Sequence, residues 1–352
     1  MTIEVIVDNQ ISREHWDEYV STQPSATPYH LFAWGEAVER AYGFKCHRFA
    51  VTENRQYVGI LPVVEMRTMT GKKHFCALPY CDVGAHISNS DAIALTLKDA
   101  LFKAAKKLAI TDIELRASEY ELLTLDAVRP GEKVRMQLSL PDSEDALMAQ
   151  FKSKLRSQIR KAEKNGLTYK TIQCNESNDG HVSDFYDIIA KNMRALGSPV
   201  HAKQWYQAIC SKYGKNAYIA LVYSEDVAVG AAIVLKAGNK ASIPWASTLA
   251  DYNRLAPNML LYWAVLSEAT KQEIAIFDFG RSTVSEGTYN FKKQWGCQPM
   301  RLDWQSFENE EQCVTAHVNK SKSRERIENV WRKLPLQMTN FLGPKIRKHI
   351  SL

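Results

Sequence analysis

The strongest constraint on the fold of this chain is an order of predicted elements that occurs twice. Hydrophobic periodicity and turn residues predict one series of strands and helices over residues 3–140 and a second series over residues 167–304. Each series reads strand, two helices, three strands, helix, strand, helix, strand. Because a duplicated architecture is the simplest account of this order, we expect two α/β domains of similar topology.

Domain boundaries follow from the ends of the two series. Length supports a division, because 352 residues are many for a single hydrophobic core. We expect an N-terminal domain over residues 1–141, a basic linker helix over residues 142–166, a C-terminal domain over residues 167–308 and a basic amphipathic tail over residues 309–352.

The linker is predicted to be one amphipathic helix that joins the two domains. Asp142 or Ser143 would cap its start, and Gly166 would end it. Its apolar residues share one helical face and are Leu147, Phe151, Leu155, Ile159 and Ala162.

Composition narrows the class of protein. Apolar residues make up 45% of the chain, no apolar run is long enough to span a membrane, and the N-terminus lacks the pattern of a signal peptide. The seven cysteines form no paired framework, so we expect reduced thiols in a cytoplasm. The net charge of +6 gathers at residues 152–164 and 320–348, and either cluster suits phosphate in a nucleic acid, nucleotide, coenzyme or lipid headgroup.

The stretch with the clearest functional character is Ile274–Gly296. An apolar run that stops before Gly280 predicts a buried strand, whose end carries Asp278, Arg281 and Ser282. Polar groups at the carboxyl end of a strand, beside a helix, are where open α/β sheets usually bind ligands. We therefore expect a ligand site here.

A helix is predicted to follow this strand. Ser285 is expected to cap it, and Tyr289 and Lys292 lie within it. A buried cation without a partner is too costly, so Arg281 and Lys292 must each be exposed, paired or facing an anion. The aromatic residues of the same stretch are expected to be core residues: Phe277, Phe279, Phe291 and Trp295.

This stretch resembles the second half of the FemAB-like transferases, which are proteins with two GNAT-like domains. The resemblance rests on two motifs, Phe277-Asp278-Phe279-Gly280-Arg281-Ser282 and Tyr289-Asn290-Phe291-Lys292-Lys293-Gln294-Trp295-Gly296. The repeated element order is also that of GNAT domains, so the resemblance covers roughly residues 4–304. It implies an α/β fold with mixed sheets, made of two tandem GNAT-like domains (the acyl-CoA N-acyltransferase fold) and a C-terminal tail, and an acyltransferase or aminoacyltransferase activity.

The resemblance also implies catalytic roles. Lys292, from the family's Phe-Lys pair, would stabilise the oxyanion that forms on the attacked carbonyl. Asp278 is the nearest candidate proton acceptor, or it forms a salt bridge with Arg281. Proton transfer assisted by the substrate, without a protein base, stays open. Residues expected to contact substrate in this half are Arg281 and Ser282 through phosphate or carbonyl oxygens, Tyr289 through its hydroxyl, and Trp245 as a wall of the cleft.

Two donors, aminoacyl-tRNA and acyl-CoA, are compatible with the sequence. Acetyl-CoA users typically carry a Gln/Arg-x-x-Gly-x-Gly/Ala loop, whereas this chain has Arg254-Leu255-Ala256-Pro257, without a glycine and with one amide donor removed by the proline. This puts coenzyme A in doubt and favours the aminoacyl-tRNA that FemAB-like proteins typically use. Asn258 either contributes to an anion site or only caps the next helix. No tightly bound cofactor and no metal are expected.

A second family motif spans Phe151–Lys164. There Lys154 and Arg156 are expected to contact phosphate, with the solvated face of a helix as the alternative.

In the first half, Trp34, Tyr80 and Asp82 fall where FemAB-like proteins hold the glycan or nucleotide part of the acceptor. The usual Tyr-Gly-Gly is Tyr80-Cys81-Asp82 here, and a purely structural first domain is the alternative.

The tail mixes aromatic, apolar and basic residues over 331–348. This composition suits the surface of an anionic membrane, and packing back onto the body is the alternative. Pro335 and Gly343-Pro344 are expected to interrupt any long helix. The tail resembles those of FemAB-like proteins linked to exopolysaccharide and PEP-CTERM protein-sorting systems of Gram-negative bacteria.

We therefore expect a cytoplasmic transferase, with peripheral inner-membrane contact through the tail as an option. It would form an amide on an amino group of a cell-envelope glycan precursor, either of peptidoglycan or of exopolysaccharide. Its partners would be a glycan or lipid-linked glycan precursor and tRNA, and DNA is not expected. The alternatives are an acyl-CoA-dependent N-acyltransferase of an amino sugar and a non-catalytic, membrane-associated polysaccharide assembly factor.

Overall fold

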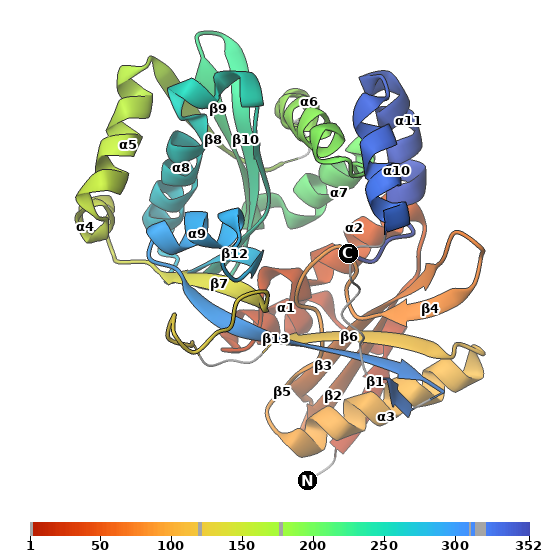
Figure 1. Ribbon diagram of the computed structural model, residues 1–352. Helices are drawn as coiled ribbons and strands as arrows, with labels where there is room; N and C mark the ends of the chain where they lie inside the picture. Colours follow the sequence, from red (N-terminus) through yellow and green to blue (C-terminus); the bar gives the residue numbers. More distant parts are fainter. Residues whose placement is uncertain (1–2, 119–121, 176–178, 310, 314–321) are drawn as a thin grey trace. The chain divides into compact units, whose positions relative to one another are not determined.

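A computed structural model describes residues 3–118, 122–175, 179–309, 311–313 and 322–352 of the chain (Figure 1). The chain folds into two compact units, each assembled from separate stretches of sequence. Unit 1 comprises residues 1–121, 301–317 and 348–352, and unit 2 comprises residues 122–300 and 318–347. Both units combine helices with a mixed sheet, which confirms the expected α/β class.

Unit 2 is built on a sheet with the strand order β7-β12-β11-β10-β9-β8. β11 and β12 are parallel, and the other neighbours are antiparallel. Tight turns with a left-handed residue, Glu225 and Gly238, connect β9 to β10 and β10 to β11. The strands are β7 (Lys133–Ser139), β8 (Leu167–Gln173), β9 (Ala217–Ser224), β10 (Val227–Ala237), β11 (Lys240–Thr248) and β12 (Ile276–Thr283).

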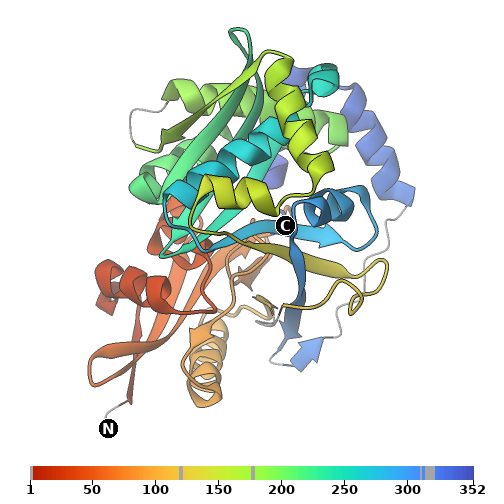
Figure 2. The ribbon, with the colours of Figure 1, turned by 90° about the vertical axis from the view of Figure 1, so that its left-hand side faces the viewer.

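Helices cover both faces of this sheet. α8 contacts β8, β9, β10 and β11, while α6 contacts β9, β10 and β11 from the opposite side (Figure 1). α4 and α5 pack on α8, so α8 is buried nearly all round; Figure 2 shows these three helices in front of the strands. The helices are α4 (Glu144–Gln150), α5 (Ser153–Lys164), α6 (Asp179–Leu196), α7 (Lys203–Tyr213), α8 (Pro257–Lys271) and α9 (Gly287–Gln294).

Unit 1 repeats the same topology, with the strand order β1-β2-β3-β4-β6-β13 and a parallel pair, β4 and β6. The apolar stripe of α3 packs on alternate residues of β2 and β3, and α1 and α2 also contact these strands. Ser12 and Ser90 cap α1 and α3 by accepting from backbone N–H groups. The elements are β1 (Ile3–Val7), α1 (Arg13–Thr22), α2 (Phe32–Tyr42), β2 (Cys46–Glu53), β3 (Gln56–Arg67), β4 (Lys73–Cys76), β5 (Ile87–Ser88), α3 (Asp91–Lys107), β6 (Asp112–Ser118), β13 (Gln298–Glu308) and β14 (Glu311–Cys313).

The two units exchange their closing strands. β7 ends the first series in the sequence but pairs with β12 in unit 2, and β13 ends the second series but pairs with β6 in unit 1. The boundaries expected at residues 141 and 308 therefore differ from the observed division, which falls before Leu122 and after Met300. Strand exchange joins residues far apart in sequence, so the order of elements cannot reveal it.

The prediction of a single linker helix is wrong. The segment forms two helices, α4 and α5, with a break at Phe151 and Lys152, and both helices lie within unit 2. The break arises because Phe151 takes extended dihedrals and buries its ring against Trp295 and Trp263. Ser143 caps α4, as expected. The short helix expected between β6 and β7 is absent from residues 122–132, and residues 119–121 lie outside the described part.

The tail forms two helices that pack back onto unit 2. These are α10 (Lys322–Lys333) and α11 (Leu336–Arg347), and both contact α6 (Figure 1). Pro335 separates them, as expected, but Gly343 and Pro344 lie inside α11, contrary to expectation. Packing explains the glycine, because a Cβ there would lie 3.1 Å from the backbone nitrogen of Val200.

The segment after α11, Lys348–Leu352, belongs to unit 1, and we call it the strap. Tyr80 holds it twice: its backbone N–H donates to the carbonyl of Ser351 at 2.6 Å, and its hydroxyl donates to the carbonyl of Lys348 at 2.6 Å. The guanidinium of Arg116, a fully buried residue, donates to the same Ser351 carbonyl at 2.9 Å and to the carbonyl of Cys81. The strap thus adds one hydrogen bond to a buried cation of unit 1 that also pairs with Glu114 at 2.9 Å.

Gly84 provides a test of packing in unit 1. A Cβ at this position would lie 2.4 Å from Cβ of Leu78 and 2.5 Å from the carbonyl oxygen of Ala77. Because the backbone cannot yield cheaply, Gly84→Ala is expected to lower the free energy of unfolding by about 2 kcal/mol or more. Urea denaturation measures this. Gly180→Ala, at a glycine with open space around it, is the control and should change stability little.

Candidate active site

The candidate site lies where two parallel strands of unit 2 part. β11 and β12 pair over three residues, ending with Ser242 opposite Asp278. Beyond this pair β11 stays with β10 as far as Thr248, while β12 continues beside β7. We call this point, defined by Ser242 and Asp278, the fork. Parting strands leave their backbone groups and inner side chains available to a ligand.

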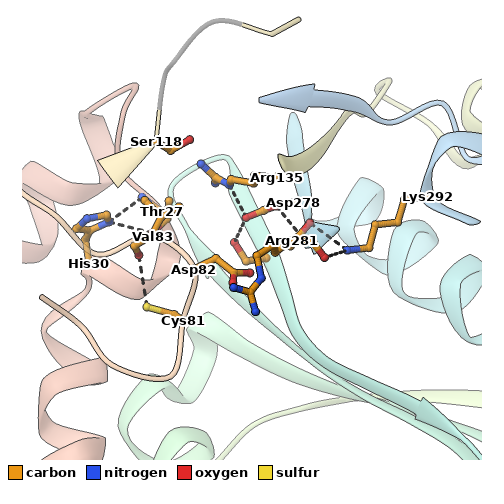
Figure 3. Close-up of polar contacts among 12 residues, drawn as sticks. Thr27, His30, Cys81, Asp82, Val83, Ser118, Arg135, Asp278, Arg281 and Lys292 are labelled. Carbon is orange, nitrogen blue, oxygen red and sulfur yellow. Dashed lines mark hydrogen bonds and ion pairs between the residues drawn. The ribbon is translucent and has the colours of Figure 1, made fainter. Parts of the chain in front are cut away.

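Asp278 is fixed at the fork by several hydrogen bonds. Its Oδ2 accepts from Nε of Arg135 at 2.8 Å and from the hydroxyl of Ser242 at 3.4 Å (Figure 3). Its Oδ1 accepts from the backbone N–H of Gly280 at 2.8 Å. Only 3% of Asp278 is exposed, so this is a buried ion pair. The partner is Arg135 on β7 and not Arg281, which was the alternative to a role of Asp278 as proton acceptor.

β12 does not stop at Gly280. It runs on to Thr283 with a register shift against β7 between Asp278 and Arg281, where Gly280 has a left-handed φ of 73°. Glycine adopts this conformation without steric cost, so the strand can bulge and continue. Arg281 and Ser282 therefore lie within the strand, not beyond its end as expected. Ser282 is buried, and its hydroxyl has no hydrogen-bond partner among the described residues.

α9 begins later than expected and without the predicted cap. Ser285 has a left-handed φ of 74° and precedes the helix, whose cap position is Glu286 with no side-chain hydrogen bond. The carbonyl of Ser285 instead accepts from the side-chain amide of Asn290 at 3.4 Å. The short connection thus brings α9 directly back to the end of β12.

Lys292 points from α9 to the backbone of β12. Its ammonium donates to the carbonyl of Gly280 at 3.0 Å and to that of Arg281 at 2.8 Å (Figure 3). The residue is only 7% exposed, so its charge is little screened by water. The bulge at Gly280 connects Asp278 with Lys292. The backbone N–H of Gly280 donates to Asp278, and the carbonyls of Gly280 and Arg281 accept from Lys292.

The aromatic candidates of unit 2 are mainly packed residues. Tyr289 is 4% exposed and belongs to the core, and burial raises the pKa of its phenol. Trp245 on β11 is half-buried and meets the rings of Trp205 and Tyr206 edge-on, at 6.0 and 5.2 Å between centroids. The four aromatic residues expected in the core contact one another or the same core: Phe277, Phe279, Phe291 and Trp295.

Asn258 does not cap α8. The cap position is Ala256, which has a left-handed φ of 63°, and Pro257 opens the helix, so Asn258 is its second residue. A proline in the first turn lacks an N–H that would otherwise be unpaired there, which explains the start. The capping alternative for Asn258 is therefore wrong.

The basic residues of α5 lie on its outer face. Lys154 is exposed, and Arg156 donates to the carbonyls of Phe151 at 3.0 Å and Ala149 at 3.4 Å, which closes the end of α4. A shallow groove of about 420 Å³ follows this face and is lined by Ser153, Arg156, Ser157, Arg160, Lys161 and Lys164. Arg156 thus has a structural role beside any contact with phosphate.

The residues expected to hold an acceptor in unit 1 are largely closed. Trp34 is fully buried, and its indole N–H donates to the carbonyl of Pro79 at 3.0 Å. Tyr80 is 5% exposed and binds the strap through both its N–H and its hydroxyl. Asp82 is half-buried, and its carbonyl accepts from Trp304. Trp34 is therefore a core residue, which corrects the expectation of a ligand contact.

Unit 1 also contains a buried histidine that the sequence did not single out. Nδ1 of His30 lies 2.9 Å from the hydroxyl of Thr27 (Figure 3). Its Nε2 lies 3.0 Å from the carbonyl of Ala85. These contacts hold together the turn before α2 and the loop after β4. We read them as structural.

Arg135 and Ser242 are the functional residues that sequence reasoning missed. A signal for Arg135 exists, because it stands in a strand between two apolar residues, Val134 and Met136, that are both buried. Such a residue needs a buried partner. Nothing in the sequence identifies Asp278 as that partner, since the two lie 143 residues apart.

No group of three or more His, Cys, Asp or Glu side chains in the described ranges is arranged to hold a metal ion. Within the same ranges, no helix is both long and apolar enough to cross a membrane.

Comparisons with known proteins bear on the fold. Residues 149–293 match the family described as acetyltransferase (GNAT) domain. FemX aligns with a TM-score of 0.63 at 14% identity, covering 87% of this chain and 98% of FemX. A tandem GNAT protein from the clavulanic acid biosynthesis pathway has a TM-score of 0.53 at 13% identity, covering 88% and 99%. L-PGS from Bacillus licheniformis has a TM-score of 0.52 at 13% identity, covering 94% and 97%.

The comparison with curated proteins found no match. At identities this low, the structural matches show the fold alone. Residues 149–293, within unit 2, are thus similar to a GNAT acetyltransferase domain, and the chain has the fold of FemX and of a tandem GNAT protein.

The ion pair at the fork can be tested by a double-mutant cycle. Arg135→Leu leaves the Asp278 carboxylate buried and unpaired, and Asp278→Leu does the same to the guanidinium, so each should lower the free energy of unfolding by about 3 kcal/mol. The double variant should be more stable than either single variant, because it leaves no buried charge. Urea denaturation gives all four values, and additive losses would contradict a direct pair. Lys103→Ala removes the exposed pair with Asp99 and serves as the control.

Lys240, at the start of β11, should make stability depend on pH. Burial and the positive charge of Arg135 lower its pKa from 10.5 to about 8. Between these values the unfolded chain holds more protons than the folded chain, so stability should rise with pH from about 8 to 10.5. Lys240→Gln should remove this rise. Thermal unfolding at closely spaced pH values measures it, and parallel curves for both proteins would contradict the assignment.

Proposed function

We propose that this protein is a transferase of the FemAB-like type. It would form an amide by moving an aminoacyl or acyl group onto an amino group of a cell-envelope glycan precursor. The observation that carries the proposal is the position of Lys292: a buried ammonium held at the end of β12, beside the fork, in the unit that matches the GNAT acetyltransferase domain.

Amide formation makes three demands on a site. The carbonyl oxygen must be stabilised as it becomes anionic, the amine must lose a proton, and the reactants must be aligned. Lys292 meets the first demand, since two carbonyls fix its ammonium and burial keeps its charge from being screened. A fixed cation costs no reorganisation when negative charge develops, which favours the transition state over the bound substrate.

Asp278 is poorly suited to take the amine's proton. Both of its oxygens already accept hydrogen bonds, and one belongs to the ion pair with Arg135. We therefore propose that Asp278 positions the Gly280 bulge and, through it, Lys292. The proton would then leave to water or to the substrate itself. Proton acceptance by Asp278 is the weaker alternative.

The remaining substrate contacts follow from where the side chains lie. Ser282 offers a buried hydroxyl without a partner among the described residues, and Arg281 precedes it on β12. We propose that they orient phosphate or carbonyl oxygens of the donor. Trp245 on β11 and Tyr289 on α9 would contact the substrate with the parts of their rings that stay accessible.

For the donor, we propose an aminoacyl-tRNA. Arg254-Leu255-Ala256-Pro257 offers no glycine-rich loop to a pyrophosphate, and Asn258 is the residue at the start of α8 that could still meet an anion. Lys154 and Arg156 would contact phosphates along the outer face of α5. The acyl-CoA alternative is favoured by one observation, the match of residues 149–293 to an acetyltransferase domain.

For the acceptor, we propose a glycan or lipid-linked glycan precursor of peptidoglycan or exopolysaccharide, met in the cytoplasm beside the inner membrane. Tyr80 and Asp82 are the unit 1 residues that could contact it, although Tyr80 now binds the strap. A non-catalytic role in polysaccharide assembly is the alternative from another class. If the protein has such a role, the Lys292→Ala variant should still support the cellular phenotype. If the protein is a transferase, this variant should lose that phenotype.

Lys292→Met tests the central claim. Loss of the cation should reduce the transfer rate by about 100-fold or more, because one donor to an oxyanion typically contributes that much. The measurement is single-turnover amide formation with purified protein, supplied in parallel with aminoacyl-tRNA and with acyl-CoA. Lys293→Met is the matched control, since this neighbouring lysine is exposed.

The same assay separates the donors. Turnover that depends on aminoacyl-tRNA supports the proposal, whereas turnover with acyl-CoA, or thermal stabilisation by coenzyme A, supports the alternative. An unchanged rate for Lys292→Met with either donor would overturn the proposed role of Lys292.

A further inference from the structure

The two tail helices have one side that packs and one that does not. Trp331 of α10 and Thr339 and Gly343 of α11 are buried on the packed side. There the guanidinium of Arg194, on α6, donates to the carbonyl of Leu334 at 2.6 Å. The helices are therefore held on unit 2, and their other sides face away from α6.

Four large apolar side chains of the tail are exposed. Ile327 is 66% and Val330 62% exposed on α10, and Met338 is 46% and Phe341 65% exposed on α11. Each pair is three residues apart, so its members are neighbours on one helical face. We call these four residues the tail patch. Four such residues on two consecutive helices are unusual for a surface that meets only water.

Basic residues border the tail patch. The ammonium of Lys345 lies 3.7 Å from the centroid of the Phe341 ring, and Arg326 and Lys333 are exposed on α10. Residues 325–348 contain six basic and two acidic side chains. One of the acidic residues, Glu328, is paired with Arg332 at 3.8 Å. The surroundings of the patch are therefore positive.

We propose that α10 and α11 form a docking surface for an anionic membrane. The tail patch would enter the boundary between headgroups and acyl chains, and the basic residues would pair with lipid phosphates. An anionic bilayer offers an apolar layer to the tail patch and, above it, a negative surface to the basic residues. This deepens the proposed function, because a lipid-linked precursor would be met at the same membrane.

A second copy of the chain fits this surface less well. Two copies joined through the same patch would bring Lys345 and its basic neighbours close to their own equivalents, where like charges repel. A negative membrane surface causes no such repulsion. The two occupants differ in a measurable way, since dimerisation depends on protein concentration and docking depends on lipid charge.

Vesicle flotation tests the proposal with the full chain. Vesicles of phosphatidylcholine with about 30% phosphatidylglycerol should carry the protein, pure phosphatidylcholine should carry much less, and added salt should weaken binding. The variant Ile327→Ser/Val330→Ser/Met338→Ser/Phe341→Ser should lose at least about ten-fold in partitioning. Its melting curve should match that of the unmodified protein, because the four side chains are exposed.

The control is Leu95→Ser/Val227→Ser, at apolar residues that are 66% and 51% exposed elsewhere on the chain. It should bind like the unmodified protein. Failure of the unmodified protein to float with anionic vesicles, or equal binding by the patch variant, overturns the proposal. So does a concentration-dependent dimer in sedimentation that the patch variant loses. The vesicles contain no glycan and no donor, so a negative result leaves the proposed transfer reaction untouched.

Discussion

The buried ion pair between Asp278 and Arg135 is the interaction on which the geometry of the candidate site depends. It fastens β12 to β7 at the residue where β12 leaves β11. A parallel pair could in principle continue to hydrogen-bond along its whole length. Here one strand is held by its other neighbour through a charge-assisted bond that burial strengthens. The ion pair therefore supports the parting of the strands at this residue.

Two further residues carry this effect to Lys292. Gly280 supplies a conformation that other residues adopt at a cost, and the resulting bulge turns the carbonyls of Gly280 and Arg281 toward the ammonium. A lysine without such carbonyls would be too costly to bury. The carbonyls of β12 thus allow the Lys292 ammonium to be buried, and the ammonium in turn pairs these carbonyls.

Features of this fold that depend on residues close in sequence could be predicted, whereas features that depend on residues far apart in sequence could not. Ser143 caps a helix where a cap was expected, because capping involves residues a few positions apart. The exchange of β7 and β13 and the pairing of Asp278 with Arg135 depend on contacts across more than a hundred residues. Local errors arose where packing overrode propensity, as when Phe151 broke the linker helix and Ser285 became a turn residue.

The piecewise assembly of unit 1 has a consequence for how the chain matures on the ribosome. Its sheet lacks a closing strand until β13 emerges, and Arg116 lacks its hydrogen bond to the Ser351 carbonyl until the strap is synthesised. All strands of the unit 2 sheet, from β7 to β12, lie before Met300, so this sheet can be completed once residue 300 has been synthesised. The half that is translated first would therefore be completed last. During that interval the nascent chain would expose one unpaired strand edge, which is the kind of edge that chaperones protect.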